Sequence, residues 1–158
     1  MPPSTALETS VQVERWSDCL PEMEEIFPLH WKELARFQDK IALKCDKERY
    51  AALEKSDVLL LVTARAEGRL VGYFVGFIMP HPHYQGSGMW GLTDMYFVLP
   101  EYRRGTGLKL FVAFEQALRE RGCVQAVTSC KIHEDHTEFL EKLGWTWTDK
   151  TFQKHLKG

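Results

Sequence analysis

The chain has 158 residues, of which 44% are hydrophobic and 27% are charged, and this predicts an ordinary globular protein with a sizeable core. Its net charge of −2 gives no support to a dedicated nucleic-acid binder, because such proteins carry a basic excess. No apolar run approaches the roughly 18 residues of a membrane-crossing helix, so we expect no membrane partner.

The N-terminal third is predicted to hold a loose end, a short strand and two helical stretches. Residues 1–9 are expected to be loose, and VQVERW alternates as a strand does. In CLPEMEEIFPLHWKELARFQ the apolar residues recur at helical spacing, but Pro28 is expected to interrupt or bend the helix. Asp46 then provides a capping residue for a helix over DKERYAALEKS.

The middle of the chain is predicted to form three long strands. Val58 to Ala66 and Leu70 to Met79 are rich in β-branched and aromatic residues, and the AEGR between them carries the glycine of a hairpin turn. HPHYQGSG has the composition of a loop. MWGLTDMYFVLP predicts the third strand, which Pro100 stops.

The C-terminal third alternates between helices and strands. GLKLFVAFEQALRERG predicts an amphipathic helix that ends at Gly122, and VQAVTSCKI predicts a fourth main strand. HEDHTEFLEKLG predicts a second helix that ends at Gly144. WTWTDKTFQKHL alternates and predicts a final edge strand or half of a hairpin, and an exposed strand from Trp145 is a place where a homodimer can pair.

This order of elements predicts an α+β fold with one mixed sheet and helices on its faces. We find no repeat, low-complexity block or linker, and therefore expect a single domain over residues 1–158.

Cysteine spacing and the N-terminal sequence indicate the compartment. The chain has four cysteines, and no two of them have C-x-x-C spacing; they are Cys19, Cys45, Cys123 and Cys130. We therefore expect reduced thiols and no metal site. MPPSTALETSVQVERW lacks the basic start and apolar block of a signal peptide. We expect a cytoplasmic protein.

The stretch LPEYRRGTGLKLF, Leu99 to Phe111, joins the third strand to the amphipathic helix. A glycine-rich strand-to-helix turn frees backbone N–H groups at the helix N-terminus, where they and the helix dipole favour an anion, above all a phosphate. Gly-rich turns with exposed arginines are also common as plain connections. On spacing alone, a phosphate cradle and a connection fit equally well.

The wider sequence resembles a known family. TDMYFVLPEYRRGTGLKLF is similar to the core of the GCN5-related N-acetyltransferase (GNAT) family, in which an apolar strand is followed by V-x-P-E-Y-R-G-x-G-x-G. FLEKLGW resembles the family's late F-Y-E-K-L-G-F. The resemblance covers about Val58 to Leu156. The small size and the HW at His30 and Trp31 are similar to compact acetyltransferases carried by some bacteriophages, so a small phage or bacterial type is expected.

The resemblance implies the GNAT fold, with a mixed, mostly antiparallel central sheet, and acetyl-CoA (coenzyme A) as cofactor. It implies an R/Q-x-x-G-x-G/A loop for the cofactor's pyrophosphate, in which Arg104, Gly107 and Lys109 occupy the three fixed places, Lys109 replacing the usual glycine or alanine. It also implies that the backbone of the preceding strand pairs with the pantetheine arm, in a gap that opens beside the strand starting near Gln125. The implied cofactor-binding residues are Phe97, Val98, Leu99, Arg103, Arg104, Gly105, Thr106, Gly107, Leu108 and Lys109.

Acetyl transfer to an amine needs a proton acceptor, and Asp94 is the first candidate. A charge inside an apolar strand is costly unless it is exposed, paired or functional, so Asp94 lies either on the wet face of the strand or at the substrate amine. The leaving thiolate needs a proton, but Leu140 stands where many relatives have a tyrosine. Cys130, His133 and His136 are the near alternatives. His136 is interpreted as a surface residue at a helix start, and His133 stays open.

Two further groups are candidates for the acceptor side. His83 and Tyr84, in the loop before the Asp94 strand, contact substrate or belong to a plain hairpin connection. His30 and Trp31 are expected to line the acceptor cleft, because the family shapes specificity with its first helices. Trp90, Phe111 and Phe114 are expected in the core.

We therefore expect an N-acetyltransferase that moves an acetyl group from acetyl-CoA to a primary amine of a small molecule or peptide by direct attack, with Asp94 accepting the proton. A non-catalytic acyl-CoA-binding or sensory module on the same fold is the alternative that the missing tyrosine favours. A second alternative is an acyltransferase-like protein that modifies a macromolecule.

Overall fold

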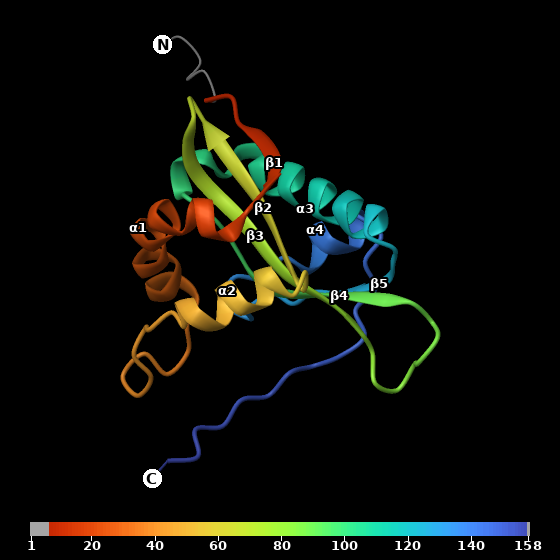
Figure 1. The fold of residues 1–158 in the computed structure, drawn as a ribbon. Helices are drawn as coiled ribbons and strands as arrows, with labels where there is room; N and C mark the ends of the chain where they lie inside the picture. The colour runs from red at the N-terminus through yellow and green to blue at the C-terminus, as the bar shows by residue number, and fades with distance from the viewer. Residues whose placement is uncertain (1–6, 158) are drawn as a thin grey trace.

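The computed structural model describes residues 7–157, and its elements follow the predicted order closely (Figure 1). Of the predicted loose end at residues 1–9, residues 1–6 lie outside the described part. Thr9 is buried and hydrogen-bonds Thr106 through its hydroxyl at 3.0 Å. The prediction of looseness is therefore wrong for Thr9.

The first helix is longer than predicted. Strand β1 spans Ser10–Glu14, and helix α1 runs from Trp16–Leu34 without the predicted interruption, although Pro21 and Pro28 both lie inside it. An interior proline costs a helix about 3 kcal/mol. Both prolines are on the exposed side, where water can solvate the carbonyls that they leave unbonded, while the opposite face is buried. Tertiary packing of that face outweighs the loss.

Helix α2 and the hairpin form as predicted. Asp46 caps α2 (Lys47–Lys55) by accepting a hydrogen bond of 3.0 Å from the Arg49 N–H. Strands β2 (Leu59–Ala66) and β3 (Arg69–Pro80) are antiparallel, and the turn places Glu67 and Gly68 at φ of 50° and 80°. Two consecutive residues with positive φ are typical of the tight turn that matches the twist of a hairpin.

Strand β4 (Met89–Val98) is the strand that positions the site. It pairs antiparallel with β3, and the register shifts at Asp94, which has no partner on β3 and forms a β-bulge. Strand β5 (Cys123–Val127) is parallel to β4 but pairs only with Met89 to Leu92. Beyond Leu92 the second half of β4 has no strand on that side within residues 7–157.

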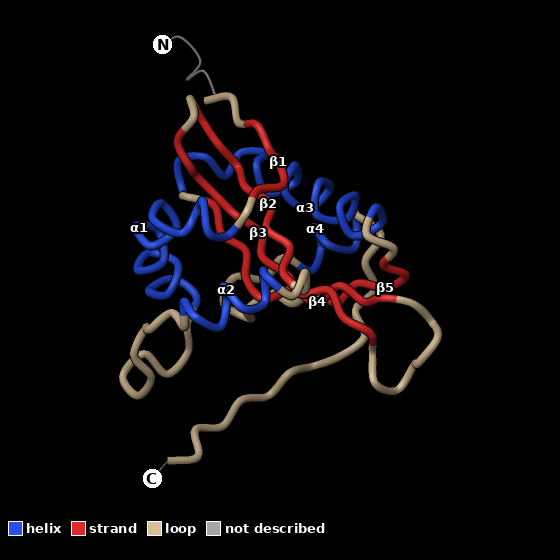
Figure 2. Tube along the Cα trace, in the orientation of Figure 1, coloured by secondary structure: helices blue, strands red, loops and turns tan. Residues whose placement is uncertain are grey.

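The five strands make one sheet in the order β1-β2-β3-β4-β5, and helices cover both of its faces (Figure 2). Helices α1 and α2 lie on one face, and α3 (Arg103–Glu120) and α4 (Thr137–Lys142) lie on the other. Phe114 of α3 stacks on Phe74 of β3 with ring centroids 3.9 Å apart, which fixes α3 against the sheet. This confirms the α+β class with a mixed, mostly antiparallel sheet.

The C-terminal segment differs from its prediction. Residues 145–157 form no strand and run as an extended chain (Figure 1), with Gln153 and His155 near the α1–α2 connection. Trp147, Phe152 and Leu156 are 65%, 87% and 86% exposed. Alternation alone does not make a strand, since a strand needs a neighbouring edge to bond, and within the described residues this segment bonds none. Pairing across a homodimer stays a prediction.

None of the helices within residues 7–157 combines the length and the apolar character that a membrane crossing needs.

Candidate active site

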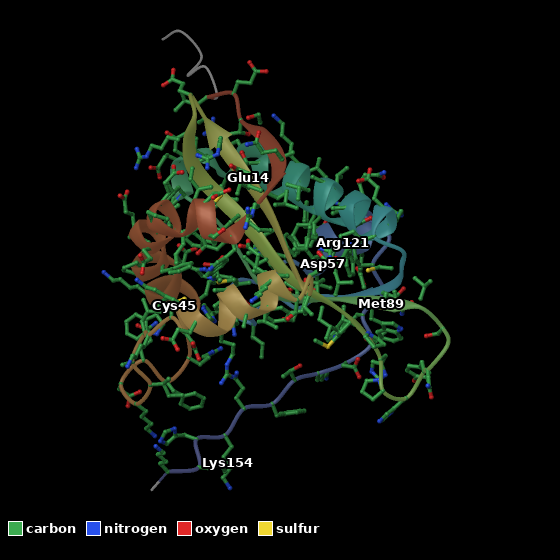
Figure 3. All side chains as sticks on the ribbon, viewed as in Figure 1. Glu14, Cys45, Asp57, Met89, Arg121 and Lys154 are labelled. Carbon is green, nitrogen blue, oxygen red and sulfur yellow. The ribbon has the colours of Figure 1, made fainter. Side chains whose placement is uncertain are left out.

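A cavity of about 530 Å³ opens where β4 and β5 separate. Its walls come from the second half of α1, the connection from α1 to α2, the bulge of β4 and residues 129–136 after β5. Cys45, labelled in Figure 3, lies in the α1–α2 connection and is part of this wall. Because all of these segments meet at the gap in the sheet, one volume collects side chains that are far apart in the sequence. We call it the acceptor cavity.

Asp94 reaches the acceptor cavity from the bulge. Its Oδ2 accepts a hydrogen bond of 2.5 Å from the Tyr50 hydroxyl on α2. Surrounding protein desolvates the carboxylate and raises the pKa of Asp94, while the Tyr50 bond acts in the opposite direction. The bulge explains the geometry: the extra residue breaks the alternation of the strand and turns the Asp94 side chain towards α2.

Tyr50 is held in place by stacking. Its ring lies 4.2 Å from that of the buried Trp16, with an angle of 14° between the ring planes. Burial first, and the nearby Asp94 carboxylate second, raise the pKa of Tyr50 far above its usual range. The phenol therefore keeps its proton and acts as a fixed donor to Asp94.

His30, the predicted acceptor-side residue, lines the cavity beside Trp31. Its Nδ1 lies 2.7 Å from the hydroxyl of the buried Tyr73, and its ring stacks on Phe97 at 4.8 Å. Burial lowers the pKa of His30 to about 4, so the ring is neutral at pH 7. This contact is a hydrogen bond between Nδ1 and the hydroxyl, and the tautomer of His30 decides which of the two donates.

The thiolate-side candidates are arranged differently from the sequence-based interpretation. Cys130 lines the cavity, with its Sγ 3.7 Å from Asp135 Oδ1. His136 also lines it, whereas the His133 ring binds the backbone carbonyl of Glu33 at 3.0 Å and is not part of the lining. The structure thus brings His136, and not His133, to the cavity.

Tyr96 is a residue that sequence reasoning missed. It lines the acceptor cavity from β4, and its hydroxyl crosses the gap to donate to the Ser129 carbonyl at 3.0 Å. Burial raises the pKa of Tyr96, so the phenol is protonated at neutral pH. An aromatic residue two places after Asp94 was the available signal, but apolar context made it resemble core.

The loop between β4 and α3 has free space beside its two glycines, Gly105 and Gly107. The short 3₁₀ helix Pro100–Tyr102 precedes it, and Arg104 and Gly105 depart from helical geometry, Gly105 with a φ of 84°. A Cβ atom built at Gly105 or Gly107 would meet no other atom within 4 Å. The helix proper therefore starts with exposed backbone and empty space in front of it, which suits a diphosphate.

The charged residues of this loop are not equivalent. Arg103 pairs with Glu33 of α1 at 2.7 Å, and Lys109 donates to the Thr9 carbonyl at 2.6 Å. Arg104 forms no ion pair with the described residues. Thr106 is buried, and Leu108 is 45% exposed. Lys109 is turned away to hold the N-terminal strand, so Arg104 is the cation best placed for a phosphate.

The open edge of β4 offers backbone groups to an extended ligand. The Leu99 N–H donates to Val71 of β3 at 2.9 Å, and Phe97 lies opposite Tyr73. Because backbone groups alternate in direction along an antiparallel strand, Val98 and Tyr96 face the gap. Of the three predicted pantetheine partners, Phe97 and Leu99 face β3 instead. Arg103 Nε donates to the Val98 carbonyl at 2.9 Å. The Val98 N–H and the backbone groups of Tyr96 are then the groups on this edge that an extended ligand can bond.

The predicted substrate residues His83 and Tyr84 lie elsewhere. Tyr84 stacks on Trp90 with ring centroids 5.4 Å apart, near the start of β4, and neither His83 nor Tyr84 lines the acceptor cavity. The loop connects β3 to β4 at the end of the sheet that is remote from the bulge.

Comparison with known proteins identifies the architecture. The model of the acetyltransferase (GNAT) family matches residues 16–145. The chain belongs to this GNAT family. Membership supports acyl transfer as the general class of reaction.

Solved structures agree on the fold. An acetyltransferase from Trypanosoma brucei is 20% identical with a TM-score of 0.71, covering 94% of this chain and 100% of that one. An aminoglycoside acetyltransferase from an uncultured soil metagenomic sample is 18% identical with a TM-score of 0.72, covering 94% and 97%. An aminoglycoside N-acetyltransferase in complex with CoA is 16% identical with a TM-score of 0.69, covering 94% and 100%. Among curated proteins no match was found. At these identities the likeness concerns the GNAT fold alone.

Proposed function

We propose that this GNAT protein is an N-acetyltransferase that moves an acetyl group from acetyl-CoA to a primary amine by direct attack. The observation that carries the proposal is the hydrogen-bonded pair of Asp94 and Tyr50, which lies in the acceptor cavity next to the unpaired half of β4. A proton acceptor, a volume for an amine and an open strand edge thus meet at one place.

The residues at the loop and the strand edge fit coenzyme A. Gly105 and Gly107 leave room for the diphosphate, Arg104 adds positive charge, and the backbone of Tyr96 and Val98 is available to the pantetheine amides. When bound, acetyl-CoA supplies an activated thioester. Lys109 is bonded to the Thr9 carbonyl and so leaves the charge at the loop to Arg104.

Asp94 is the proposed proton acceptor. An amine attacks only in its neutral form, so its ammonium proton has to be taken up near the site. A raised pKa makes the Asp94 carboxylate a stronger base, while the proton of Tyr50 keeps the reactive oxygen in a fixed direction. Asp94 holds the proton on its carboxylate and passes it to the water of the cavity.

Tyr96 is the proposed proton donor in the gap. Leu140 has no proton to give, whereas the Tyr96 hydroxyl lies in the gap and stays protonated at neutral pH, so it donates a hydrogen bond to the leaving thiolate, and a proton that the attacking amine loses replaces the one that Tyr96 gives up. In the tautomer with its proton on Nε2, the neutral His30 is a second donor on the cavity wall and supports a developing negative charge without carrying a positive one.

The proposal is tested by incubating the purified protein with acetyl-CoA and a panel of primary amines. Free thiol and acetylated amine are measured in the same samples. We expect the two to appear in equal amounts with at least one amine. CoA binding by calorimetry without any amine product across the panel would favour the non-catalytic acyl-CoA-binding module instead.

A further inference from the structure

A second cavity continues the acceptor cavity outwards. It has a volume of about 370 Å³ and shares Trp31, Leu43, Lys44 and Lys131 with the acceptor cavity. Its remaining wall comes from the α1–α2 connection and from Gln153 of the C-terminal segment. The shared residues place the two volumes next to each other, and we treat them as one groove with Asp94 at the inner end and the second cavity at the outer end. We call it the acceptor groove.

Charge is distributed unevenly along the acceptor groove. The carboxylates of Asp46, Asp94 and Glu134 line the inner cavity, Lys44 and Lys131 line both cavities, and Arg36 lines the outer one, where no carboxylate of the described residues contributes to the wall. In the described part of the chain, none of these three cations is in an ion pair. Like charges that share a small volume repel one another unless an anion lies between them. The outer end is therefore complementary to a negative group.

The wall between the two ends is apolar. Trp31 and Leu43 line both cavities, and Leu34 lines the inner one. Such a wall binds a hydrocarbon or aromatic spacer favourably, because both surfaces leave water on contact. A spacer that carries further charges would lose its hydration without gaining a partner there. The acceptor groove thus has carboxylates at its inner cavity only, an apolar wall, two lysines that line both cavities, and cations without a carboxylate at its outer cavity.

We propose that the acceptor is an amine that also carries an anionic group, a carboxylate or a phosphate, joined to the amine by an apolar spacer. The ammonium lies at Asp94, and the anionic group lies among Lys44, Lys131 and Arg36. The assignment of the amine as acetyl acceptor rests on the proposed function, but the charge selectivity of the groove is a property of binding and is measured without catalysis.

The test is a calorimetric binding series with the CoA-saturated protein. The probes are ω-amino carboxylates of increasing chain length, each compared with its carboxamide, with the diamine and with the aminoalkyl phosphate of equal length. We expect the best carboxylate or phosphate to bind at least about tenfold more tightly than the matched carboxamide, which corresponds to about 1.4 kcal/mol. The carboxylate and phosphate arms show which anion the groove prefers.

The double variant Lys44→Met/Lys131→Met is expected to remove this preference, so that acid and amide bind equally, while affinity for the amide stays within about twofold. Lys40→Met, an exposed lysine of the same connection that lines neither cavity, is the matched control and should keep the full preference. Diamines or amides that bind as tightly as the acids, or a preference unchanged in the double variant, would overturn the proposal. The proposed function is tested apart from this series, by incubating the tightest-binding probe with acetyl-CoA: absence of acetylated product there would count against catalysis and would leave the charge preference measured by calorimetry intact.

Discussion

The Tyr50 hydroxyl donates to Asp94 Oδ2 at 2.5 Å and so links helix α2 to the bulge of β4. This bond opposes the effect of burial on the carboxylate, because it stabilises the charged form. It couples the orientation of Asp94 to a ring that is itself stacked on Trp16.

Replacement of Tyr50 by phenylalanine should move the acid limb of the pH profile of kcat/KM to higher pH. The hydrogen bond lowers the pKa of Asp94, so its loss lets burial raise that pKa further, and a base with a higher pKa becomes protonated at a higher pH. The stacking on Trp16 is kept by phenylalanine. An acid limb at the same pH in both proteins would show that Tyr50 does not tune the catalytic base.

Substitution of Gly107 by valine should weaken CoA binding at least about tenfold without lowering the unfolding temperature. A Cβ at Gly107 meets no protein atom within 4 Å, so the added side chain enters the space proposed for the diphosphate. Calorimetric titration with CoA measures the effect. Lys109→Met is the comparison, because Lys109 is bonded to Thr9, and its CoA affinity should change by less than about threefold. A larger loss in Lys109→Met than in Gly107→Val would contradict the assignment of the loop.

Tyr96→Phe should lower kcat about 100-fold with little change in the affinity for CoA, since it removes the proton donor and keeps the ring. His136→Gln removes the imidazole on that wall and should leave kcat within about threefold of the wild type, on the same scale of general acid effects. Both variants are compared under saturating substrates. If His136→Gln shows the large loss and Tyr96→Phe does not, then the donor is His136.

The neutral His30 should make stability depend on pH. Its pKa is lowered from 6.5 to about 4 in the folded protein, so the unfolded chain binds a proton first as the pH falls. The full stability is present above pH 6.5. As the pH falls to about 4, the free energy of unfolding decreases by about 3 kcal/mol. Urea unfolding of wild type and His30→Gln across this range isolates the contribution, because other groups titrate in both. Parallel pH dependence of the two proteins would contradict the buried neutral ring.

Local patterns were sufficient for most of the fold. The positive φ of Glu67 and Gly68 in the hairpin, the cap at Asp46 and the helix ends at Gly122 and Gly144 all depend on neighbours in the sequence. The uninterrupted α1 was not predictable in this way, because its survival through Pro28 depends on packing of the opposite face. The same holds for residues 145–157, whose alternation would make a strand only by pairing with a sheet edge, and within the described residues this segment pairs with none.

The open glycine loop could be predicted from the sequence, whereas the contacts around Asp94 could not, and the role of the loop stays a prediction. Asp94 was found as a charge in an apolar strand, but its partner Tyr50 is far away in the sequence and is brought near only by the packing of α2. The bulge at Asp94 breaks the period of two, so alternation misjudges which side Tyr96 faces. The bond from Lys109 to Thr9 likewise depends on the position of the N-terminal strand.

The most direct test of the account is the Asp94→Asn variant, studied with acetyl-CoA and an amine that the wild type acetylates. Affinity for acetyl-CoA should stay within about twofold, and kcat should fall at least about 100-fold at neutral pH, as expected for loss of a proton acceptor. Turnover at the wild-type rate, with acetylated amine formed in equal amount to free thiol, would contradict the assignment of Asp94 and with it the proposed mechanism.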